Sequence, residues 1–400
     1  MTEPITQSRT ESTTAHVSEP MHKSRKILIV GPSWVGDMVM AQSLFIALQR
    51  AQPTAIIDVL APGWSRPLLA RMPQVRKAIE LPIKHRELAL RKRYDLGVAL
   101  RHEQYDQAIL LPNSFKSALI PLFAKIPLRT GWRGEMRGAL LNDCRLLDKA
   151  SLPLMVQRFV ALALPAGAAL KPEDCPRPEL YSDQDAVQQT LQQMGVESSP
   201  STQRLVLCPG AEFGDSKQWP ASHFAELANK ALSAGWQVVI VGSANDAGIS
   251  SAIEQQAQAQ AQAPKSAQTL KSGQASPHTS GQHSWFNLTG RTSLAQVIDV
   301  IASATAVVSN DSGLMHIAAA LQRPLLALYG STSADFTPPL AERVKLLASD
   351  IECRPCFQRS CPLGHKRCLT ELSADMAWSG VQEVLAQKPG SQNPDLNNGA

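Results

Sequence analysis

The stretch that decides the fold is Lys26-Ile-Leu-Ile-Val30, followed directly by Gly31-Pro-Ser-Trp-Val-Gly-Asp37. A short, mainly apolar run that stops at a glycine is typical of a buried strand. Apolar residues then recur at helical spacing over residues 38–50, and residues 55–60 form a second apolar run. A strand, a helix and another strand in this order predict a parallel βαβ unit, whose first loop lies where α/β proteins bind ligands.

The same alternation of apolar runs and helical patterns continues along the chain in two series. Strands are expected at residues 75–81, 107–111, 128–132, 204–208, 237–241, 306–309 and 325–329, and helices at residues 221–234 and 313–321. Residues 172–203 are rich in Pro, Gln and Ser, and we place the connector between two domains at residues 181–203. The predicted fold is therefore α/β with two open domains, residues 25–180 and 204–387. Each is too short for a closed (β/α)₈ barrel, which needs about 250 residues.

Three segments have compositions that do not support a packed core. Residues 255–282 consist almost entirely of Gln, Ala, Ser, Gly and other small or polar residues, whose burial does not offset the entropy lost on ordering. We predict a low-complexity surface insertion there, with its Gln/Ala half extending the preceding helix. Residues 1–24 and 388–400 are predicted to be disordered tails.

The composition excludes several classes of protein. Hydrophobic residues make up 44% of the 400 residues, which is enough for sizeable cores, and the net charge of +5 is far below the basic excess of a nucleic-acid-binding protein. The sequence contains no run of about 18 apolar residues that would indicate a transmembrane segment, and its start lacks the apolar region of a secretory signal. Seven cysteines without an export signal are typical of reduced thiols in a cytoplasmic protein.

The loop at residues 31–37 has the G-x-x-x-x-G spacing of a phosphate-binding loop, but Asp37 stands where that motif has its lysine. A carboxylate in that place would repel a phosphate. Two interpretations fit the loop equally well. Asp37 either lies in an ordinary strand–helix turn, near the helix N-terminus, or is held at a cleft to accept a proton.

A second candidate loop, residues 209–220, follows the first strand of the second domain. Its glycines, among them Gly210, allow the backbone to approach a ligand closely, and Lys217 is a mobile positive charge suited to phosphate. Most lysines are simply exposed to solvent, so the interpretation as a site depends on the position of Lys217 more than on its residue type.

The most informative segment is Ser309-Asn-Asp-Ser-Gly-Leu-Met-His316, where a strand ends and small polar residues introduce a helix. The free N–H groups and the dipole of such a helix favour an anion, so Ser312 and Gly313 indicate a diphosphate site. Asp311 is also a plausible N-cap of this helix, and a lone helical histidine such as His316 is more often structural than catalytic.

The segment Cys353-x-x-Cys356-x4-Cys361-x6-Cys368, with His365 inside it, has one cysteine pair at metal-ligand spacing, but its later spacings match no common zinc finger. We expect reduced structural thiols here and predict no metal site. A bound metal is the second interpretation of this segment, and a disulfide is the last.

Other catalytic patterns are missing or misplaced. The sequence has no G-x-S-x-G motif, which argues against a serine nucleophile. Its D-x-D pattern, which begins at Asp183, lies in the connector and is expected to start a helix, so it does not indicate a metal-dependent nucleotide-sugar site. The basic run over residues 84–93 is expected to form one solvated helix face, or else to meet an acidic substrate or an anionic lipid surface.

Several of these motifs occur together in one known family. Lys26-Ile-Leu-Ile-Val with Gly36-Asp37, Lys217-x-Trp-Pro220 and Asp311-Ser-Gly-Leu-Met-His316 resemble the lipopolysaccharide heptosyltransferases of glycosyltransferase family 9. Pro324-x4-Leu-Tyr-Gly-Ser-Thr332 is similar to the next strand and loop of that family, and the cysteine segment resembles the branch that adds the second heptose. The resemblance covers about residues 25–386 in one continuous order, and only the insertion departs from it.

The resemblance implies a GT-B fold, in which two Rossmann-like domains face a central cleft and the C-terminal domain binds the donor. It implies an inverting transfer of L-glycero-D-manno-heptose from ADP-heptose to the first inner-core heptose of Kdo-lipid A. This acceptor would be reached at the membrane surface, on the cytoplasmic face of the inner membrane, without a cofactor or a catalytic metal. Asp37 would be the base for the acceptor hydroxyl, and Lys217 would stabilise the departing diphosphate. The donor-binding residues would be Gly210, Glu212, Gly242, Ser243, Asp311, Ser312, Gly313 and His316.

Other interpretations remain open at this point. The chain is alternatively another heptosyltransferase of the same family, although the cysteine segment argues against the first and the third. A GT-B-like sugar-nucleotide epimerase would need no lipid acceptor, and a non-catalytic sugar-nucleotide-binding protein would keep only the fold. His102 and Glu103 are rivals of Asp37 for the role of base, but they follow a basic helix rather than a strand end.

Overall fold

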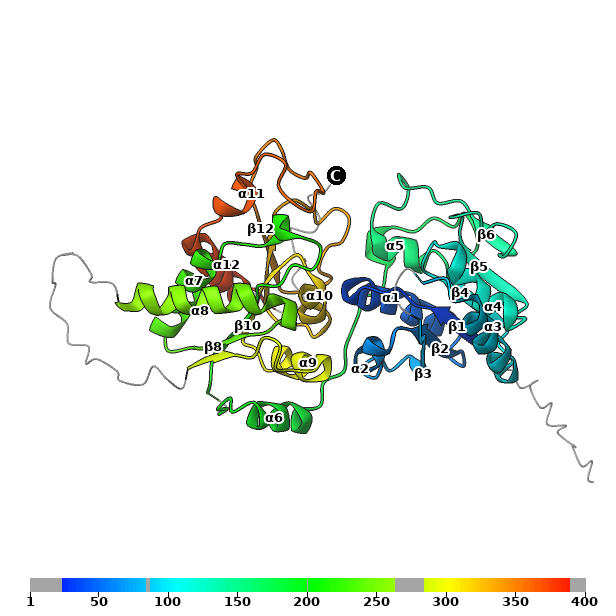
Figure 1. The fold of residues 1–400 in the computed structure, drawn as a ribbon, viewed down its shortest axis with the longest axis horizontal. Helices are drawn as coiled ribbons and strands as arrows, with labels where there is room; N and C mark the ends of the chain where they lie inside the picture. The colour runs from blue at the N-terminus through cyan, green and yellow to red at the C-terminus, as the bar shows by residue number, and fades with distance from the viewer. Residues whose placement is uncertain (1–23, 84–86, 200, 263–283, 389–400) are drawn as a thin grey trace, which may run out of the picture.

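The computed structural model of the chain describes residues 24–83, 87–199, 201–262 and 284–388. Nearly all of the two predicted tails, and residues 263–282 of the predicted insertion, therefore lie outside the described residues. Figure 1 shows two α/β domains side by side, the N-terminal one built on the first sheet and the C-terminal one on the second.

The first sheet has the strand order β3-β2-β1-β4-β5-β6, and all its strands are parallel. Its strands are β1 (Lys26–Val30), β2 (Ile56–Ala61), β3 (Val75–Glu80), β4 (Gln107–Leu110), β5 (Leu128–Trp132) and β6 (Asp143–Arg145). Val30, the last residue of β1, pairs with both Leu60 and Leu110. The loops after these three strands therefore leave the sheet at the same carboxyl edge.

The second sheet repeats this topology with the strand order β12-β11-β10-β7-β8-β9. Its strands are β7 (Arg204–Cys208), β8 (Gln237–Ile240), β9 (Trp285–Asn287), β10 (Ala306–Asn310), β11 (Leu325–Tyr329) and β12 (Val344–Ala348). Both sheets thus have the doubly wound 3-2-1-4-5-6 order, in which the direction of winding reverses between the first and fourth strands. Ligands bind outside the carboxyl ends of the strands at this switch point.

Helices cover both faces of each sheet. In the N-terminal domain they are α1 (Val35–Ala51), α2 (Arg66–Leu69), α3 (Leu90–Ala99), α4 (Leu119–Phe123) and α5 (Met155–Val160). In the connector and the C-terminal domain they are α6 (Gln184–Gln193), α7 (Ala221–Ser233), α8 (Ala247–Gln262), α9 (Leu294–Ala302), α10 (Gly313–Ala320), α11 (Arg367–Thr370) and α12 (Ala374–Ala386).

One hydrophobic cluster runs between the two sheets and joins the domains. It includes Ile27 and Ile29 of β1, and it continues through buried residues of α1 and α2 into α9 and α10 of the other domain. The alternate strand residues Leu28 and Val30 face a separate cluster on the other side of the first sheet. An ion pair of 2.5 Å between Arg71 and the buried Asp299 adds a polar link between the domains. The core therefore holds the two switch points close to one another.

The strand predictions are confirmed to within about a residue at each end, and Asp183 does start a helix, since its carboxylate accepts the N–H of Asp185 at 3.0 Å. One prediction is wrong. Arg93 does not lie on a solvated face: it is buried, because its guanidinium donates to the carbonyls of Leu88 and Lys116. The Gln/Ala half of the insertion extends α8 as expected, but it also contributes Ala257 to the core.

Candidate active site

The N-termini of α1 and α10 meet between the domains, at the switch points of the two sheets. A methyl group on Gly313 would lie 2.7 Å from Cβ of Val35, and one on Gly36 would lie 2.7 Å from Cδ2 of His316. Any side chain at either glycine would push the two helices apart. The two glycines therefore allow the loop after β1 and the loop after β10 to approach across the domain interface.

The central polar contact is the ion pair between Lys217 and Asp311. Lys217 Nζ lies 2.6 Å from Asp311 Oδ2, and the two side chains are only 13% and 5% exposed. The hydroxyl of Thr332 donates to the same carboxylate oxygen at 2.5 Å. Loops after three adjacent strands of the second sheet thus converge on one charge pair.

Asp37 lies in the first turn of α1 but does not cap it. The N-cap is Trp34, and no side chain caps this helix. Burial raises the pKa of Asp37 to about 6, and the charge of Lys217 acts in the opposite direction. A role for Asp37 as an ordinary residue of a strand–helix turn does not explain why it is buried near the charge of Lys217. A carboxylate with a pKa near 6 is mostly ionised at pH 7 and can accept a proton there, which suits a general base.

His316 is buried beside Gly36, and the burial that lowers its pKa keeps the ring neutral at pH 7. Burial lowers the pKa of His316 to about 4, against the influence of Asp311, which raises it. A neutral imidazole has one donor and one acceptor nitrogen, so it can offer a hydrogen bond to a ligand oxygen without adding charge.

Gly210, Gly242 and Ser243 gather around Asp246, which sequence reasoning missed. A methyl group on Gly210 would lie 2.8 Å from the Asp246 carboxyl, and the N–H and hydroxyl of Ser243 each donate to Asp246 Oδ2 at 2.8 Å. Ser243 and Asp246 have the three-residue spacing of a capping box, and this spacing could have identified Asp246 from the sequence. An open cavity of about 400 Å³ begins beside this turn, lined among others by Ala247 and Thr289.

Two of the expected site residues have positions that differ from what their motifs suggest. Asp311 is not the N-cap of α10: Ser312 occupies that place, and its side chain makes no capping bond. The carboxylate of Asp311 is engaged by Lys217 and Thr332 instead. Glu212 is exposed, and within the described part of the chain it has no polar contact with the charge pair.

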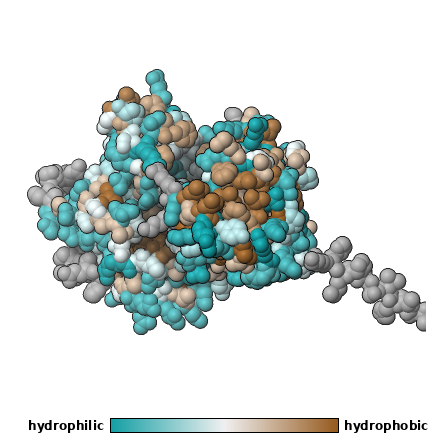
Figure 2. Space-filling model, turned by 45° about the vertical axis from the view of Figure 1, so that its right-hand side comes forward, coloured by the Kyte–Doolittle hydropathy of each residue, from teal (hydrophilic) through white to brown (hydrophobic). Residues whose placement is uncertain are grey.

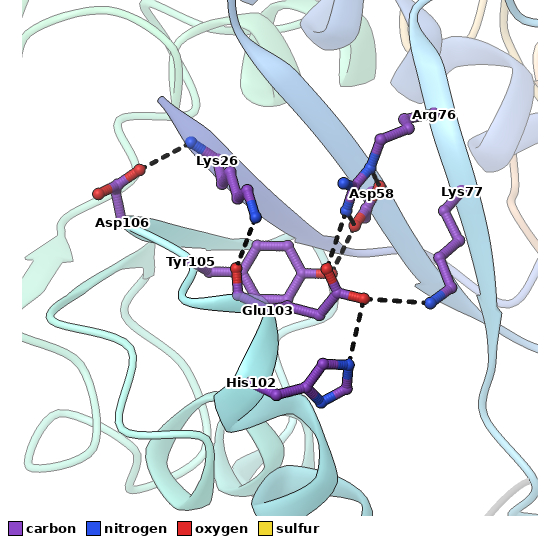
Figure 3. Close-up of polar contacts among 8 residues, drawn as sticks. All are labelled: Lys26, Asp58, Arg76, Lys77, His102, Glu103, Tyr105 and Asp106. Carbon is purple, nitrogen blue, oxygen red and sulfur yellow. Dashed lines mark hydrogen bonds and ion pairs between the residues drawn. The ribbon is translucent and has the colours of Figure 1, made fainter. Parts of the chain in front are cut away.

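His102 and Glu103 lie at the opposite edge of the first sheet. Glu103 contacts Lys77 at 3.1 Å, and its backbone carbonyl accepts a hydrogen bond from Lys26, the first residue of β1 (Figure 3). Hydrogen bonds from Lys77 and Arg76 lower the pKa of Glu103. Because these groups surround the amino ends of the strands, neither His102 nor Glu103 faces the carboxyl edge where Asp37 lies.

The four cysteines of the C-terminal segment, together with His365, line one small cavity of about 60 Å³. All four have free thiols. Hydrogen bonds from backbone N–H groups, that of Lys366 first, lower the pKa of Cys361. Among the described residues, no three His, Cys, Asp or Glu side chains are placed to hold one metal ion. The absence of a metal stays a prediction.

Two doubly wound, Rossmann-like sheets packed against each other are the architecture of the GT-B class. The family model of glycosyltransferase family 9 (heptosyltransferase) matches residues 93–367, and the chain belongs to this family. In the described residues, no helix is both long and apolar enough to cross a membrane.

The similarity extends over nearly the whole chain. Lipopolysaccharide heptosyltransferase 2 of Salmonella typhimurium is 49% identical over 366 residues, which are 91% of this chain and 99% of the relative. Lipopolysaccharide heptosyltransferase 2 of Escherichia coli is 48% identical over 365 residues, again 91% and 99% of the two chains. The solved structure of E. coli ADP-heptose lps heptosyltransferase II has a TM-score of 0.75 at 43% identity, and the match covers 90% of this chain and 98% of that one.

Proposed function

We propose that this chain transfers L-glycero-D-manno-heptose from ADP-heptose to the first inner-core heptose of Kdo-lipid A, with inversion at the anomeric carbon. The relatives that match 91% of it are named lipopolysaccharide heptosyltransferase 2. The observation that carries the mechanism is the placement of Asp37 and Lys217 within electrostatic reach of each other from opposite domains. Sugar transfer requires a base on one side of the anomeric carbon and a positive charge on the other.

Asp37 is the proposed general base. A sugar hydroxyl is a poor nucleophile, and inversion requires it to attack the face opposite the departing ADP. The hydroxyl oxygen forms the new bond to the anomeric carbon while its proton passes to the Asp37 carboxylate. The bond to the diphosphate oxygen breaks, and its electron pair leaves with ADP. The pKa of about 6 leaves most of Asp37 ionised, and thus able to accept a proton, at pH 7.

Lys217 is the proposed catalytic cation for the leaving group. Its ammonium group and the free N–H groups at the start of α10 supply the positive potential that a departing diphosphate needs. Asp311 would repel a phosphate directly, so we assign it the role of holding Lys217. Because these groups stabilise the negative charge of the leaving group, we expect no catalytic metal and no cofactor.

The remaining proposed donor contacts lie at the same carboxyl edge of the second sheet. Gly313 and Ser312 expose backbone N–H groups to the diphosphate, and neutral His316 offers a hydrogen bond beside them. Gly210, Gly242 and Ser243 surround the turn at Asp246, and we assign this turn to the nucleoside of the donor. We keep Glu212 among the proposed donor-binding residues, because an exposed side chain can turn toward a bound donor.

The acceptor is membrane-bound, and we propose that the chain works as a peripheral cytoplasmic protein at the inner face of the inner membrane. Every strand of the first sheet is followed at its carboxyl edge by an exposed large apolar side chain: Trp34, Trp64, Leu88, Phe115, Met136 and Leu146. Met136 is 93% exposed. Figure 2 shows hydrophobic residues on the surface of the N-terminal domain. Large apolar side chains exposed along one edge of a sheet are a candidate surface for contact with a membrane.

The test is a product assay with ADP-heptose, with and without a core acceptor that carries one heptose. Transfer to the acceptor with release of ADP supports the proposal. Conversion of ADP-heptose into an isomer without acceptor would identify an epimerase, and binding without turnover would identify a binding protein. An acceptor that lacks the first heptose is the matched control, and it should remain unmodified.

A further inference from the structure

The segment that carries the cysteines packs against the loop that carries Lys217. Within the cysteine loop, defined here as residues 353–366, the carbonyl of Gln358 accepts a hydrogen bond from the hydroxyl of Ser216, and the carbonyl of Arg359 accepts from its N–H at 3.2 Å. Lys366 Nζ lies 2.6 Å from Asp215 Oδ2. Ser216 and Asp215 directly precede Lys217, so three polar contacts fix the short turn from which the lysine extends.

The approach of the two backbones at this point is close. A methyl group on Gly214 would lie 2.2 Å from the carbonyl oxygen of Arg359. The cysteine loop therefore packs directly against the backbone of the turn at residues 214–217. The small cavity lined by the four cysteines also touches Ser216 and Ser331, whose hydroxyls lie 2.9 Å apart.

The cysteine loop also holds the other half of the charge pair. The guanidinium of Arg354 donates to the carbonyls of Gly330, Ser349 and Thr332, at 2.9, 3.2 and 3.0 Å. Thr332 in turn donates its hydroxyl to Asp311, the partner of Lys217. The cysteine loop thus contacts two of the three loops that converge on the Lys217–Asp311 pair, the one that carries Lys217 and the one that carries Thr332.

We propose that the cysteine loop is a positioning element for the diphosphate site, and that Arg354 and Lys366 are its positioning residues. This inference rests on the proposed function, because it assigns Lys217 to the leaving group. Arg354 sets the loop after β11, which orients Asp311 through Thr332. Lys366 sets the turn at residues 214–217. Both act on the reaction only through the position of the Lys217 ammonium group.

A double-mutant cycle separates positioning from general stability. Arg354→Ala should lower kcat about tenfold or more with a smaller change in donor KM, as Lys217→Ala does. In the Lys217→Ala background, the same change at Arg354 should lower kcat less than about twofold further, because the group that it positions is gone. Additive losses in the double variant would overturn the proposal, and so would an unchanged kcat in Arg354→Ala.

Lys366→Ala provides a second variant should Arg354→Ala fail to fold, and it should show the same loss of effect in the Lys217→Ala background. Lys366→Arg, which can keep the contact with Asp215, should restore most of the activity. The matched control is Arg367→Ala: within the described residues, the polar contact of the Arg367 side chain is with Glu371 on the surface, so kcat should stay within about twofold of wild type. A comparable loss in the control would show that any change in this segment lowers activity.

Failure of this inference can be told from failure of the proposed function. If the wild-type chain transfers heptose and the losses add, only the positioning role is wrong. If the wild-type chain transfers no heptose, the function is wrong, and the coupling is then read from the affinity for ADP by calorimetry. Arg354→Ala should weaken ADP binding in the wild-type background but not in the Lys217→Ala background, and independent effects on the affinity would contradict the inference.

Discussion

Burial raises the pKa of Asp37 to about 6, and the charge of Lys217, which belongs to the other domain, acts against that rise. The residues are 180 positions apart in sequence, and each lies at the carboxyl edge of its own sheet. Their electrostatic contact exists only because the two domains are packed with α1 against α10. This pair joins the proposed base on the acceptor side to the proposed cation on the donor side.

The pH dependence of the reaction should reflect the raised pKa of Asp37. A general base acts in its ionised form, so kcat/KM should fall as the pH drops through about 6 and should level off above pH 7. The ring of His316 stays neutral over this range, because its pKa is about 4. Initial rates measured from pH 5 to 8 check this, and a value of kcat/KM that stays level from pH 8 down to pH 5 would contradict the environment assigned to Asp37.

Lys217→Ala should slow the chemical step. Negative charge on the diphosphate grows as the bond to the sugar breaks, so the lysine is worth more in the transition state than in the bound donor. We expect kcat to fall by about 10²–10³-fold with a smaller rise in donor KM. Steady-state kinetics of the variant measure both parameters. If only the donor KM rises, Lys217 stabilises the bound donor and the transition state equally and is not a leaving-group catalyst.

The fold follows from the sequence because its strands are short apolar runs that end at glycine or small polar residues. Lys26-Ile-Leu-Ile-Val30 is an example, and its bounds agree with β1. The strands β6 and β9 were not predicted. Each has three residues and no fully buried position, so neither shows a continuous apolar run.

The candidate site is harder to read from the sequence, since its contacts join distant loops. Motif positions pointed to Lys217 and Asp311, but the sequence does not show that Asp311 holds Lys217 rather than caps α10. The parts played by Thr332, Asp246 and Arg354 depend on how loops fold back on one another. Arg93 was misplaced for a similar reason, because carbonyls of two separate loops bury its guanidinium.

The part of the insertion beyond α8 should be dispensable. Residues 263–283 include a single large apolar side chain, Leu270, so their composition offers little to a core. Replacing residues 264–282 with a short Gly/Ser linker should change the melting temperature and kcat little. Ala257→Asp is the control within α8: it buries a carboxylate next to α7 and should lower the melting temperature by several degrees. A loss of turnover beyond about tenfold in the linker variant would show that the insertion contributes to activity.

The cysteine segment should act without a metal. Elemental analysis of the purified protein should find well under one zinc ion per chain, and treatment with a chelator should leave the melting temperature unchanged. Stoichiometric zinc that resists dialysis and is lost in Cys353→Ser would reverse this expectation.

Asp37→Asn should separate catalysis from stability. The folded state prefers protonated Asp37, because burial raises its pKa from 3.8 to about 6. Ionisation of the wild-type carboxyl therefore reduces the free energy of unfolding as the pH rises from about 4 to 6, by up to roughly 3 kcal/mol at pH 7. The neutral amide lacks this penalty, so the melting temperature of Asp37→Asn at pH 7 should equal or exceed that of the wild type.

The most direct test of the account is the turnover number of Asp37→Asn with ADP-heptose and the one-heptose acceptor at pH 7, measured alongside its affinity for ADP. Asparagine keeps the size of the side chain and removes only its basicity. The account predicts a fall in kcat of about 10²–10⁴-fold with ADP affinity close to wild type. Near-normal turnover would contradict the assignment of Asp37 as the base.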